Sequence, residues 1–244
     1  PNVKTRISII PSWADPAKIK PIQRSKNWFI QRHNLHNVFT VIYSGNQGRC
    51  HDLLTLLDAA DHIRDNTKVR FLIIGSGAQH RELVARVAAL KLPNVCFLPY
   101  QDAEALPAML AAADLAVVSL RAAAEGQVAP SKLYGHLAAG SPLAVICSEG
   151  SYLRREVSRA GCGNSFRSGE GEKLAVWIAQ LAANPDLCRE LGNASRRHLL
   201  ATATPELVVQ AYAEVLARHL PLNQKAYAPP LNQQSIPQIG RAHV

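Results

Sequence analysis

The chain has 244 residues, 48% of them hydrophobic and 18% charged, which is enough for one sizeable α/β domain with extensions. Lysine and arginine outnumber aspartate and glutamate by 27 to 18, a net charge of +9 that suits anionic partners such as phosphorylated substrates. The basic residues are scattered without a recognition helix or zinc finger, which argues against nucleic-acid function, and no apolar run reaches the ~18 residues that span a bilayer.

The first 37 residues are rich in proline and polar side chains, and we interpret them as an entry segment ahead of the main domain. Within this segment, residues 6–10 form a β-like run, and residues 25–33 are compatible with a helix. The main domain is predicted to begin at residue 38, where the first sustained apolar run starts.

From residue 38 to residue 160, short apolar runs alternate with amphipathic stretches. Strands are predicted at residues 38–44, 69–74, 95–98, 115–119 and 143–147. Helices are predicted at about residues 52–64, 78–90, 104–112, 131–139 and 151–159. This alternation is typical of a doubly wound α/β fold, a parallel sheet with helices on both faces.

Beyond residue 169 the pattern is wholly helical. We expect extra C-terminal helices at residues 172–183, 186–200 and 205–220, separated by the pairs Asn184-Pro185 and Thr204-Pro205. The main domain is therefore assigned to residues 38–220. Residues 221–244 hold prolines, glutamines and asparagines without periodicity, and we expect a loosely ordered tail.

The five cysteines, at positions 50, 96, 147, 162 and 188, are odd in number and widely spaced. They form no C-x-x-C pair and have no histidine at zinc spacing, so we expect neither a disulfide framework nor a metal site. A reducing compartment, the cytoplasm, is the simplest interpretation.

The segment from Glu125 to residue 146 carries the strongest functional signal. A polar loop follows the predicted strand at residues 115–119, and Ser131 is placed to cap a helix that ends at Gly140. Free N–H groups and the positive end of the helix dipole favour an anion there. Lys132 stands at the first helical position, where its charge opposes the dipole, and a bound phosphate would resolve that conflict.

Two glycine-containing loops follow the first two strands. Gly45 and Gly48 permit a close backbone approach to a phosphate, although a tight strand-to-helix turn explains them equally well. Gly75-Ser-Gly77 begins like a dinucleotide-binding pattern but has His80 in place of the third glycine, so we expect no NAD-type site. Its glycines are explained either by close packing at a turn or by ligand contact.

Tyr100 and Gln101 follow the predicted strand at residues 95–98. The aromatic ring offers a face on which a nucleobase can stack, whereas a helix-starting turn capped by Asp102 is the competing interpretation. His51 and His136 stand near the proposed phosphate loops, but a lone histidine is more often a packed or surface residue than a catalytic one.

Four of these segments occur in the order found in a known family. They are Val-Ile-Tyr-Ser-Gly-Asn-Gln-Gly48, Phe-Leu-Ile-Ile-Gly-Ser-Gly77, Asn-Val-Cys-Phe-Leu-Pro-Tyr100 and Pro-Ser-Lys-Leu-Tyr-Gly-His-Leu-Ala-Ala-Gly140. With them, the chain from residue 1 to about residue 220 resembles the C-terminal, donor-binding domain of GT-B fold glycosyltransferases, in the retaining group called family 4 or group 1. The resemblance implies the Rossmann-like half of a GT-B fold.

The resemblance also implies that the domain binds a nucleotide-diphosphate sugar, UDP-linked rather than GDP-linked, without a tightly bound cofactor or a metal. The base would lie near Tyr100 and Gln101. Lys132 would neutralise the leaving diphosphate, and Glu125 is the candidate carboxylate. The remaining donor-binding residues implied are Gly45, Asn46, Gly48, Gly75, Ser131 and Leu133.

The sequence departs from the family pattern at two pairs of positions. The two glutamates of the family, separated by seven residues, fall at Gln127 and Gly135. Glu125, two positions early, replaces the first glutamate only if the loop is shifted. Asn46 and His51 stand where the family commonly has arginine and lysine.

GT-B enzymes have a second, amino-terminal domain that binds the acceptor, and we find no counterpart of it here. We therefore expect a fragment that binds donor nucleotide weakly and transfers no sugar alone, the whole enzyme acting with retention on a polysaccharide or lipid-linked acceptor. Arg154, Arg155 and Arg159 would suit the inner face of an anionic membrane, although a solvated helix face explains them as well.

Two other functions stay open. A noncatalytic α/β interaction module that has lost nucleotide binding is favoured by Gln127 and Gly135, whereas Lys132 and the glycine loop favour the enzyme. A nucleotide-sugar epimerase half of the same fold needs acid and base side chains, and this chain offers only Glu125 and histidines.

Overall fold

The computed structural model describes residues 7–219, and the chain divides into two compact units. The larger unit consists of Pro11–Val208. Of the described residues, 7–10 and 209–219 belong to the other unit, which contains the last turns of α9 (Pro205–His219). The described strands and the helices before α9 all belong to the larger unit.

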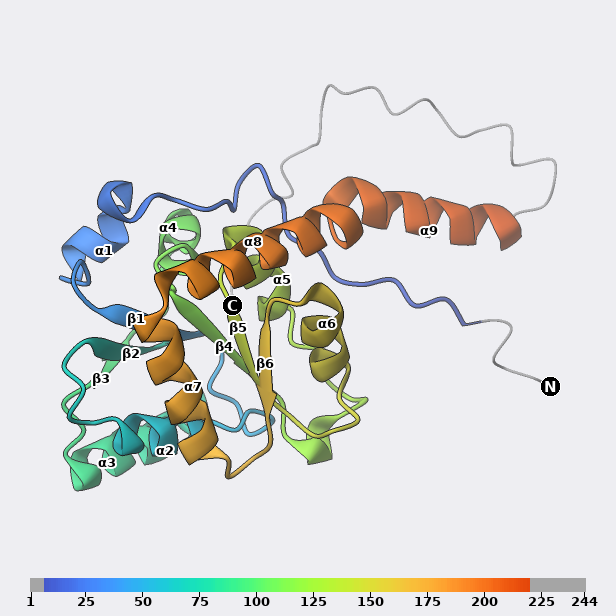
Figure 1. Ribbon diagram of the computed structural model, residues 1–244. Coiled ribbons are helices and arrows are strands. Elements are labelled where there is room, and N and C mark those ends of the chain that lie inside the picture. The colour runs from blue at the N-terminus through green and yellow to red at the C-terminus, as the bar shows by residue number, and fades with distance from the viewer. Residues whose placement is uncertain (1–6, 220–244) are drawn as a thin grey trace. The chain divides into compact units, whose positions relative to one another are not determined.

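Six parallel strands form the sheet of the larger unit (Figure 1). They are β1 (Phe39–Ser44), β2 (Val69–Ile74), β3 (Val95–Leu98), β4 (Leu115–Ser119), β5 (Leu143–Ile146) and β6 (Gly163–Phe166). Their order is β3-β2-β1-β4-β5-β6, and each neighbouring pair is parallel. The predicted doubly wound sheet is confirmed, and its order reverses between β1 and β4, where open sheets of this kind bind ligands.

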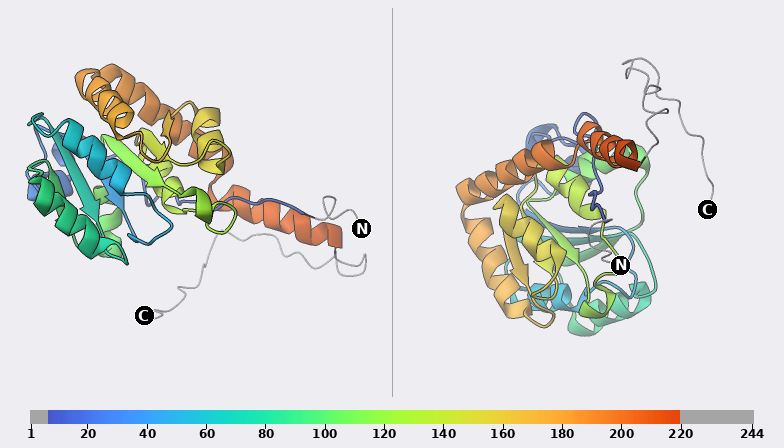
Figure 2. Two further views of the ribbon diagram at one scale, coloured as in Figure 1. Left: turned by 90° about the horizontal axis from the view of Figure 1, so that it is seen from below. Right: turned by 90° about the vertical axis from the view of Figure 1, so that its right-hand side faces the viewer.

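Helices cover both faces of this sheet (Figure 2). One face carries α1 (Trp28–Arg32), α4 (Leu106–Leu110), α5 (Lys132–Ala139), α6 (Tyr152–Ala160) and α8 (Pro185–Thr202). The other carries α2 (Leu54–His62), α3 (His80–Leu90) and α7 (Gly171–Ala183). Because side chains alternate along a strand, Ile42 of β1 packs in the first core and Tyr43 in the second.

Most predicted elements are present with small shifts of their boundaries. The strands β2, β3 and β4 coincide with the predicted ranges. The predicted helix at residues 104–112 is split into a 3₁₀ turn (Ala103–Ala105) and the short α4, because Pro107 has no N–H group to continue a helical ladder. The strand predicted at residues 6–10 is wrong over residues 7–10, which pair with no described strand. Residue 6 and the predicted tail at 221–244 lie outside the described residues.

The edge strand β6 was not predicted. Its sequence, Gly-Asn-Ser-Phe, begins with residues of low β propensity, so no local pattern marks it as a strand. Pairing with β5 forms it, and a Cβ atom on Gly163 would lie 1.8 Å from the Leu143 carbonyl oxygen. Glycine is therefore required at position 163 by close backbone approach, which only the folded chain reveals.

Candidate functional site

The carboxyl ends of β1 and β2, the loop after β3 and the start of α5 surround a cavity of about 580 Å³. The cavity lies at the carboxyl ends of the strands, next to β1, where the strand order reverses. The fold thus brings together loops from widely separated parts of the sequence. Six of the predicted site residues line the cavity: Gly45, Asn46, Tyr100, Gln101, Ser131 and Lys132.

Lys132 is the first residue of α5, and its side chain lies against β1. Its Nζ atom donates a hydrogen bond to Tyr43 Oη at 2.7 Å and lies 4.0 Å from the centroid of the Tyr43 ring. Burial lowers the pKa of Lys132 to about 7. The ammonium group is therefore held in the cavity wall with part of its hydration removed.

Two histidines lie close to Lys132, and both are neutral at pH 7. Burial, and then the positive charge of Lys132, lower the pKa of His51, and lower that of His136 to about 3. His51 Nδ1 lies 2.6 Å from the Ser119 carbonyl oxygen, so this nitrogen carries the proton and donates. His136 is fully buried, with Nε2 3.3 Å from Ser44 Oγ and no partner for Nδ1 among the described residues.

The loop after β1 has fewer free N–H groups than its sequence suggests. The Gly45 N–H donates to the carbonyl oxygen of Ile74, the last residue of β2, at 2.9 Å. The Gln47 N–H donates to the carbonyl oxygen of Ser76, in the loop after β2, at 2.8 Å. Across residues 7–219, the N–H groups of Asn46 and Gly48 have no acceptor. These two are left to bind an anion, and of the two residues only Asn46 lines the cavity.

Gly75 brings the loops after β1 and β2 together. A Cβ atom on Gly75 would lie 2.3 Å from the Gly45 carbonyl oxygen and 3.1 Å from the Tyr100 ring. Its φ of +113° is also a conformation that favours glycine. Gly75 does not line the cavity, so of the two interpretations of its loop the structure supports close packing.

The prediction that the Ser131 side chain caps α5 is wrong. Ser131 already has helical backbone angles, φ −64° and ψ −21°, and its side chain makes no capping hydrogen bond. The N–H group of Leu133 bonds to the Pro130 carbonyl at 3.4 Å, and the Leu133 side chain is buried in the core. In the described chain the N–H groups of Ser131 and Lys132 have no acceptor, so the start of α5 retains the potential to bind an anion.

Glu125 does not line the cavity. Its carboxylate accepts a hydrogen bond from Ser148 Oγ at 3.3 Å, and the Gln127 side chain donates to the Ala123 carbonyl oxygen. The described residues that line the cavity include no aspartate, glutamate or arginine, and Lys132 is the one lysine among them. Residues 7–219 also contain no group of three His, Cys, Asp or Glu residues placed to hold a metal ion.

The apolar wall of the cavity was missed by the sequence analysis. Its residues come from the entry segment and from α4, and they are Trp13, Ala14, Ile19, Leu106, Met109 and Leu110. Trp13 leaves 54% of its surface exposed, which gives this wall a large aromatic face. No periodic signal marks the part of the entry segment that contains Trp13, Ala14 and Ile19, so only the folded chain places it beside the predicted loops.

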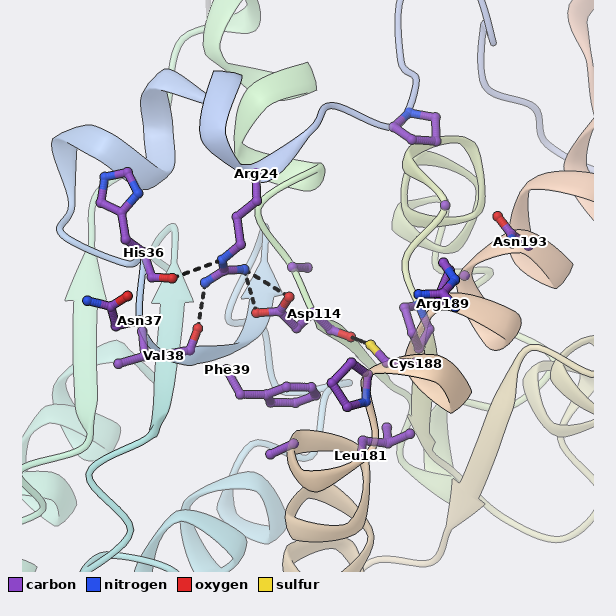
Figure 3. A pocket seen from close by; sticks show the side chains of 17 residues that line it. Arg24, His36, Asn37, Val38, Phe39, Asp114, Leu181, Cys188, Arg189 and Asn193 are labelled. Atoms are coloured by element: carbon purple, nitrogen blue, oxygen red, sulfur yellow. Dashed lines mark hydrogen bonds and ion pairs between the residues drawn. The ribbon is translucent and has the colours of Figure 1, made fainter.

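A second cavity, of about 630 Å³, lies at the opposite edge of the sheet, where β1 and β4 begin (Figure 3). There Arg24 donates to both carboxylate oxygens of Asp114, at 2.8 and 2.7 Å, and to three main-chain carbonyls. The Cys188 thiol donates to the Asp114 carbonyl oxygen at 3.3 Å. Because these polar groups already have partners, the cavity beside Lys132 is the better candidate for ligand binding.

The family model for glycosyl transferases group 1 matches residues 25–198 of the chain. WcaI of Escherichia coli (strain K12), assigned to colanic acid biosynthesis as a glycosyl transferase, is 38% identical over 109 residues, which cover 45% of this chain and 26% of WcaI. WbjE of Pseudomonas aeruginosa, assigned as a glycosyltransferase, is 30% identical over 184 residues, covering 74% of this chain and 45% of WbjE. The chain therefore spans less than half the length of these curated relatives.

Solved structures of other proteins share this fold. Sucrose-phosphate synthase from Thermosynechococcus elongatus superposes with a TM-score of 0.72 at 21% identity, over 87% of this chain and 52% of that chain. HepE from Anabaena, in complex with UDP and glucose, superposes with a TM-score of 0.73 at 18% identity, over 86% of this chain and 56% of that chain.

Proposed function

Because the chain belongs to the group 1 glycosyl transferase family, we propose that the cavity beside Lys132 binds the donor of a sugar transfer, a nucleotide-diphosphate sugar. The observation that carries this proposal is the Lys132 ammonium group, held in the cavity wall beside the uncapped start of α5. A cation and free helix N–H groups next to one cavity suit a diphosphate.

Each part of the donor has a place in this proposal. The base stacks on Tyr100, whose side chain lines the cavity next to Gln101 and is 58% exposed. The diphosphate lies between the N–H group of Asn46 and those of Ser131 and Lys132. UDP is preferred to GDP, and support for this comes from HepE, which has been solved with UDP and with UDP-glucose.

In the proposed reaction the bond between the anomeric carbon and the diphosphate oxygen breaks, and negative charge develops on the departing diphosphate. The anomeric carbon bonds to an acceptor hydroxyl oxygen, and the proton of that hydroxyl group leaves with the diphosphate. Lys132 and the N–H groups at the start of α5 neutralise that charge as it forms. Because no carboxylate lines the described cavity, the proposal gives this chain leaving-group stabilisation and no acid–base step. The proposed transfer retains the configuration of the sugar at its anomeric carbon.

We infer that the acceptor-binding half of the enzyme lies outside this chain. The chain covers 52% and 56% of the two structural neighbours, which leaves room for a second domain of similar size. The isolated chain is then expected to bind donor and to transfer no sugar. A polysaccharide or lipid-linked acceptor is proposed, with support from the assignment of WcaI to colanic acid biosynthesis.

The proposed location is the cytoplasm, at or near the inner face of the membrane. Within residues 7–219, no helix combines the length and apolar character needed to cross a bilayer. On α6, Arg155 donates to the Gly150 carbonyl oxygen and Arg159 pairs with Glu156, so these two arginines are partly engaged within the chain.

A noncatalytic interaction module is the second candidate. It is favoured by the absence of carboxylates from the described lining residues and by Gly135, which puts no side chain into the cavity. An epimerase half is disfavoured by the same observation, since that reaction needs an acid and a base.

Titration of UDP and of GDP into the chain tests the proposal, with Lys132→Met and Lys68→Met as matched variants. Both substitutions remove one positive charge, but Lys68 is exposed and precedes β2 at the opposite edge of the sheet. We expect UDP binding that weakens roughly tenfold or more in Lys132→Met, because a hydrogen bond to a charged group is lost, and that is unchanged in Lys68→Met. The absence of binding at millimolar nucleotide would instead support the noncatalytic module.

A further inference from the structure

We propose that Tyr43 is the positioning residue for Lys132, and that its hydroxyl group joins the start of α5 to the loop after β1 so that both present one preformed diphosphate site. This inference rests on the proposed function. It concerns the next-to-last residue of the buried strand β1, to which the sequence patterns assign no role of its own.

The Tyr43 hydroxyl group contacts both sides of the site. It accepts a hydrogen bond from Lys132 Nζ at 2.7 Å and donates one to the Asn46 carbonyl oxygen at 2.7 Å. A phenol has a single proton, and a carbonyl can only accept, so the direction of both bonds is determined. The helix and the glycine loop are therefore linked through one oxygen atom.

The Tyr43 ring also supports the cation. Nζ lies 4.0 Å from the ring centroid, within the range of a cation–π interaction, and the ring itself is fully buried. The ring also makes a T-shaped contact with His51, with 5.9 Å between the ring centroids, which helps to hold its orientation. Gly45 lies next to the lysine, since a Cβ atom there would be in van der Waals contact with Nζ at 3.4 Å.

Without this hydroxyl group, hydration would draw Lys132 outward. A lysine on the first turn of a helix has a long flexible stem and a strongly hydrated head, and the helix dipole repels it. The described lining residues supply no carboxylate that could hold the ammonium group instead. The other titratable groups near Lys132 and Tyr43 are Cys50, His51, His136 and Tyr100. Tyr43 therefore holds the side chain before the ligand arrives, which removes an ordering cost from binding.

The test compares Tyr43→Phe with Tyr152→Phe. The first substitution keeps the ring and removes the hydroxyl group between Lys132 and Asn46. The second removes a buried phenolic oxygen that has no partner among the described residues, and it serves as the control. UDP affinity and its dependence on pH are measured for both variants, for the wild type and for Lys132→Met, with unfolding curves to verify the fold.

We expect Tyr43→Phe to weaken UDP binding roughly threefold to tenfold, as loss of one hydrogen bond to a charged group predicts. We also expect the pH at which binding is half lost to move upward, because an ammonium group that hydration draws outward escapes the burial that lowers its pKa. Burial already lowers the pKa of Lys132 to about 7, so this midpoint lies in an accessible range. Tyr152→Phe should change neither quantity.

The outcomes separate the two proposals. If the wild type binds no UDP, the proposed function fails, and the role of Tyr43 fails with it. If the wild type binds UDP and Lys132→Met does not, while Tyr43→Phe keeps the wild-type pH midpoint, the positioning role alone is overturned. That result would hold even if affinity fell, because a purely structural hydroxyl group would not shift the midpoint.

Discussion

The ammonium nitrogen of Lys132 lies 3.4 Å from the point at which a side chain on Gly45 would begin. Gly45 has a φ of +116°, a conformation that favours glycine, and a Cβ atom there would come into van der Waals contact with the ammonium group. The turn after β1 and the position of the lysine are therefore coupled through one glycine. A sequence pattern shows the glycine but not this contact.

Gly45→Ala tests that coupling. A φ of +116° is strained for any residue with a Cβ atom, and the added methyl group would touch Nζ, so we expect the chain to lose about 1–3 kcal/mol of stability and to bind UDP more weakly. Gly161→Ala is the control, since Gly161 has a φ of +58° and no atom within 4 Å of its added Cβ. Urea unfolding and UDP titration measure both effects. Equal losses in the two variants, with UDP binding intact, would contradict the coupling.

Tyr100→Ala tests the proposed base site. We expect UDP affinity to fall by about 1–3 kcal/mol, the range for loss of base–aromatic stacking, with little change in stability because the side chain is 58% exposed. Tyr212→Ala on α9 removes a similarly exposed tyrosine, 52% exposed, that does not line the cavity. Calorimetric titration of both variants decides the matter. An unchanged UDP affinity in Tyr100→Ala would show that the base does not stack on Tyr100.

His136 makes the fold sensitive to acid. Burial lowers its pKa to about 3 in the folded state, whereas the unfolded state keeps the ordinary value of 6.5. Between these values the unfolded state binds the extra proton, so the free energy of unfolding falls as pH falls through this window, by about 2 kcal/mol from pH 7 to pH 5. Urea unfolding at both pH values should show a smaller difference in His136→Gln. The exposed His62, changed to Gln, provides the control, and a slope unaltered by His136→Gln would argue against the assignment.

Arg24→Met tests the ion pair at the opposite edge of the sheet. Both partners are partly buried, and the variant leaves the Asp114 carboxylate and several carbonyl groups without their donor, so we expect a loss of about 2–3 kcal/mol. Arg189→Met breaks an exposed pair with Asp186 and should lose less than about 1 kcal/mol. Unfolding curves give both values. UDP binding should be preserved in each variant, since the cavity beside Lys132 lies at the other edge, and its loss in Arg24→Met would contradict that separation.

Local sequence patterns predicted the fold well where they reported on a single element. Strand ranges such as 69–74 and 115–119 are read directly from runs of buried apolar residues, and Gly140, with a φ of +73°, ends α5 at the predicted residue. The pattern failed where neighbours decide the structure. Strand β6 exists because β5 pairs with it. The split of the predicted helix before α4 has a local cause instead, since Pro107 has no N–H group, which a pattern of apolar residues does not register.

The candidate site divides in the same way. Loop positions at the carboxyl ends of strands follow from the alternation of strands and helices, so Tyr100 and Lys132 were selected from the sequence, and they line one cavity. Asn46, which lines the same cavity, was selected through the family resemblance. The direction in which a side chain points could not be predicted in this way. Glu125, selected in the loop between β4 and α5, contacts Ser148 instead of the cavity.

From its sequence alone this protein is identifiable as an alternating α/β chain with polar loops after its strands, since strand and helix periodicity is a local property of neighbouring residues. Tertiary structure alone places Tyr43 beneath Lys132 and the entry segment against α4. These contacts join residues far apart in the chain, and they depend on how whole helices and strands pack together. Short stretches of sequence carry no information about that packing.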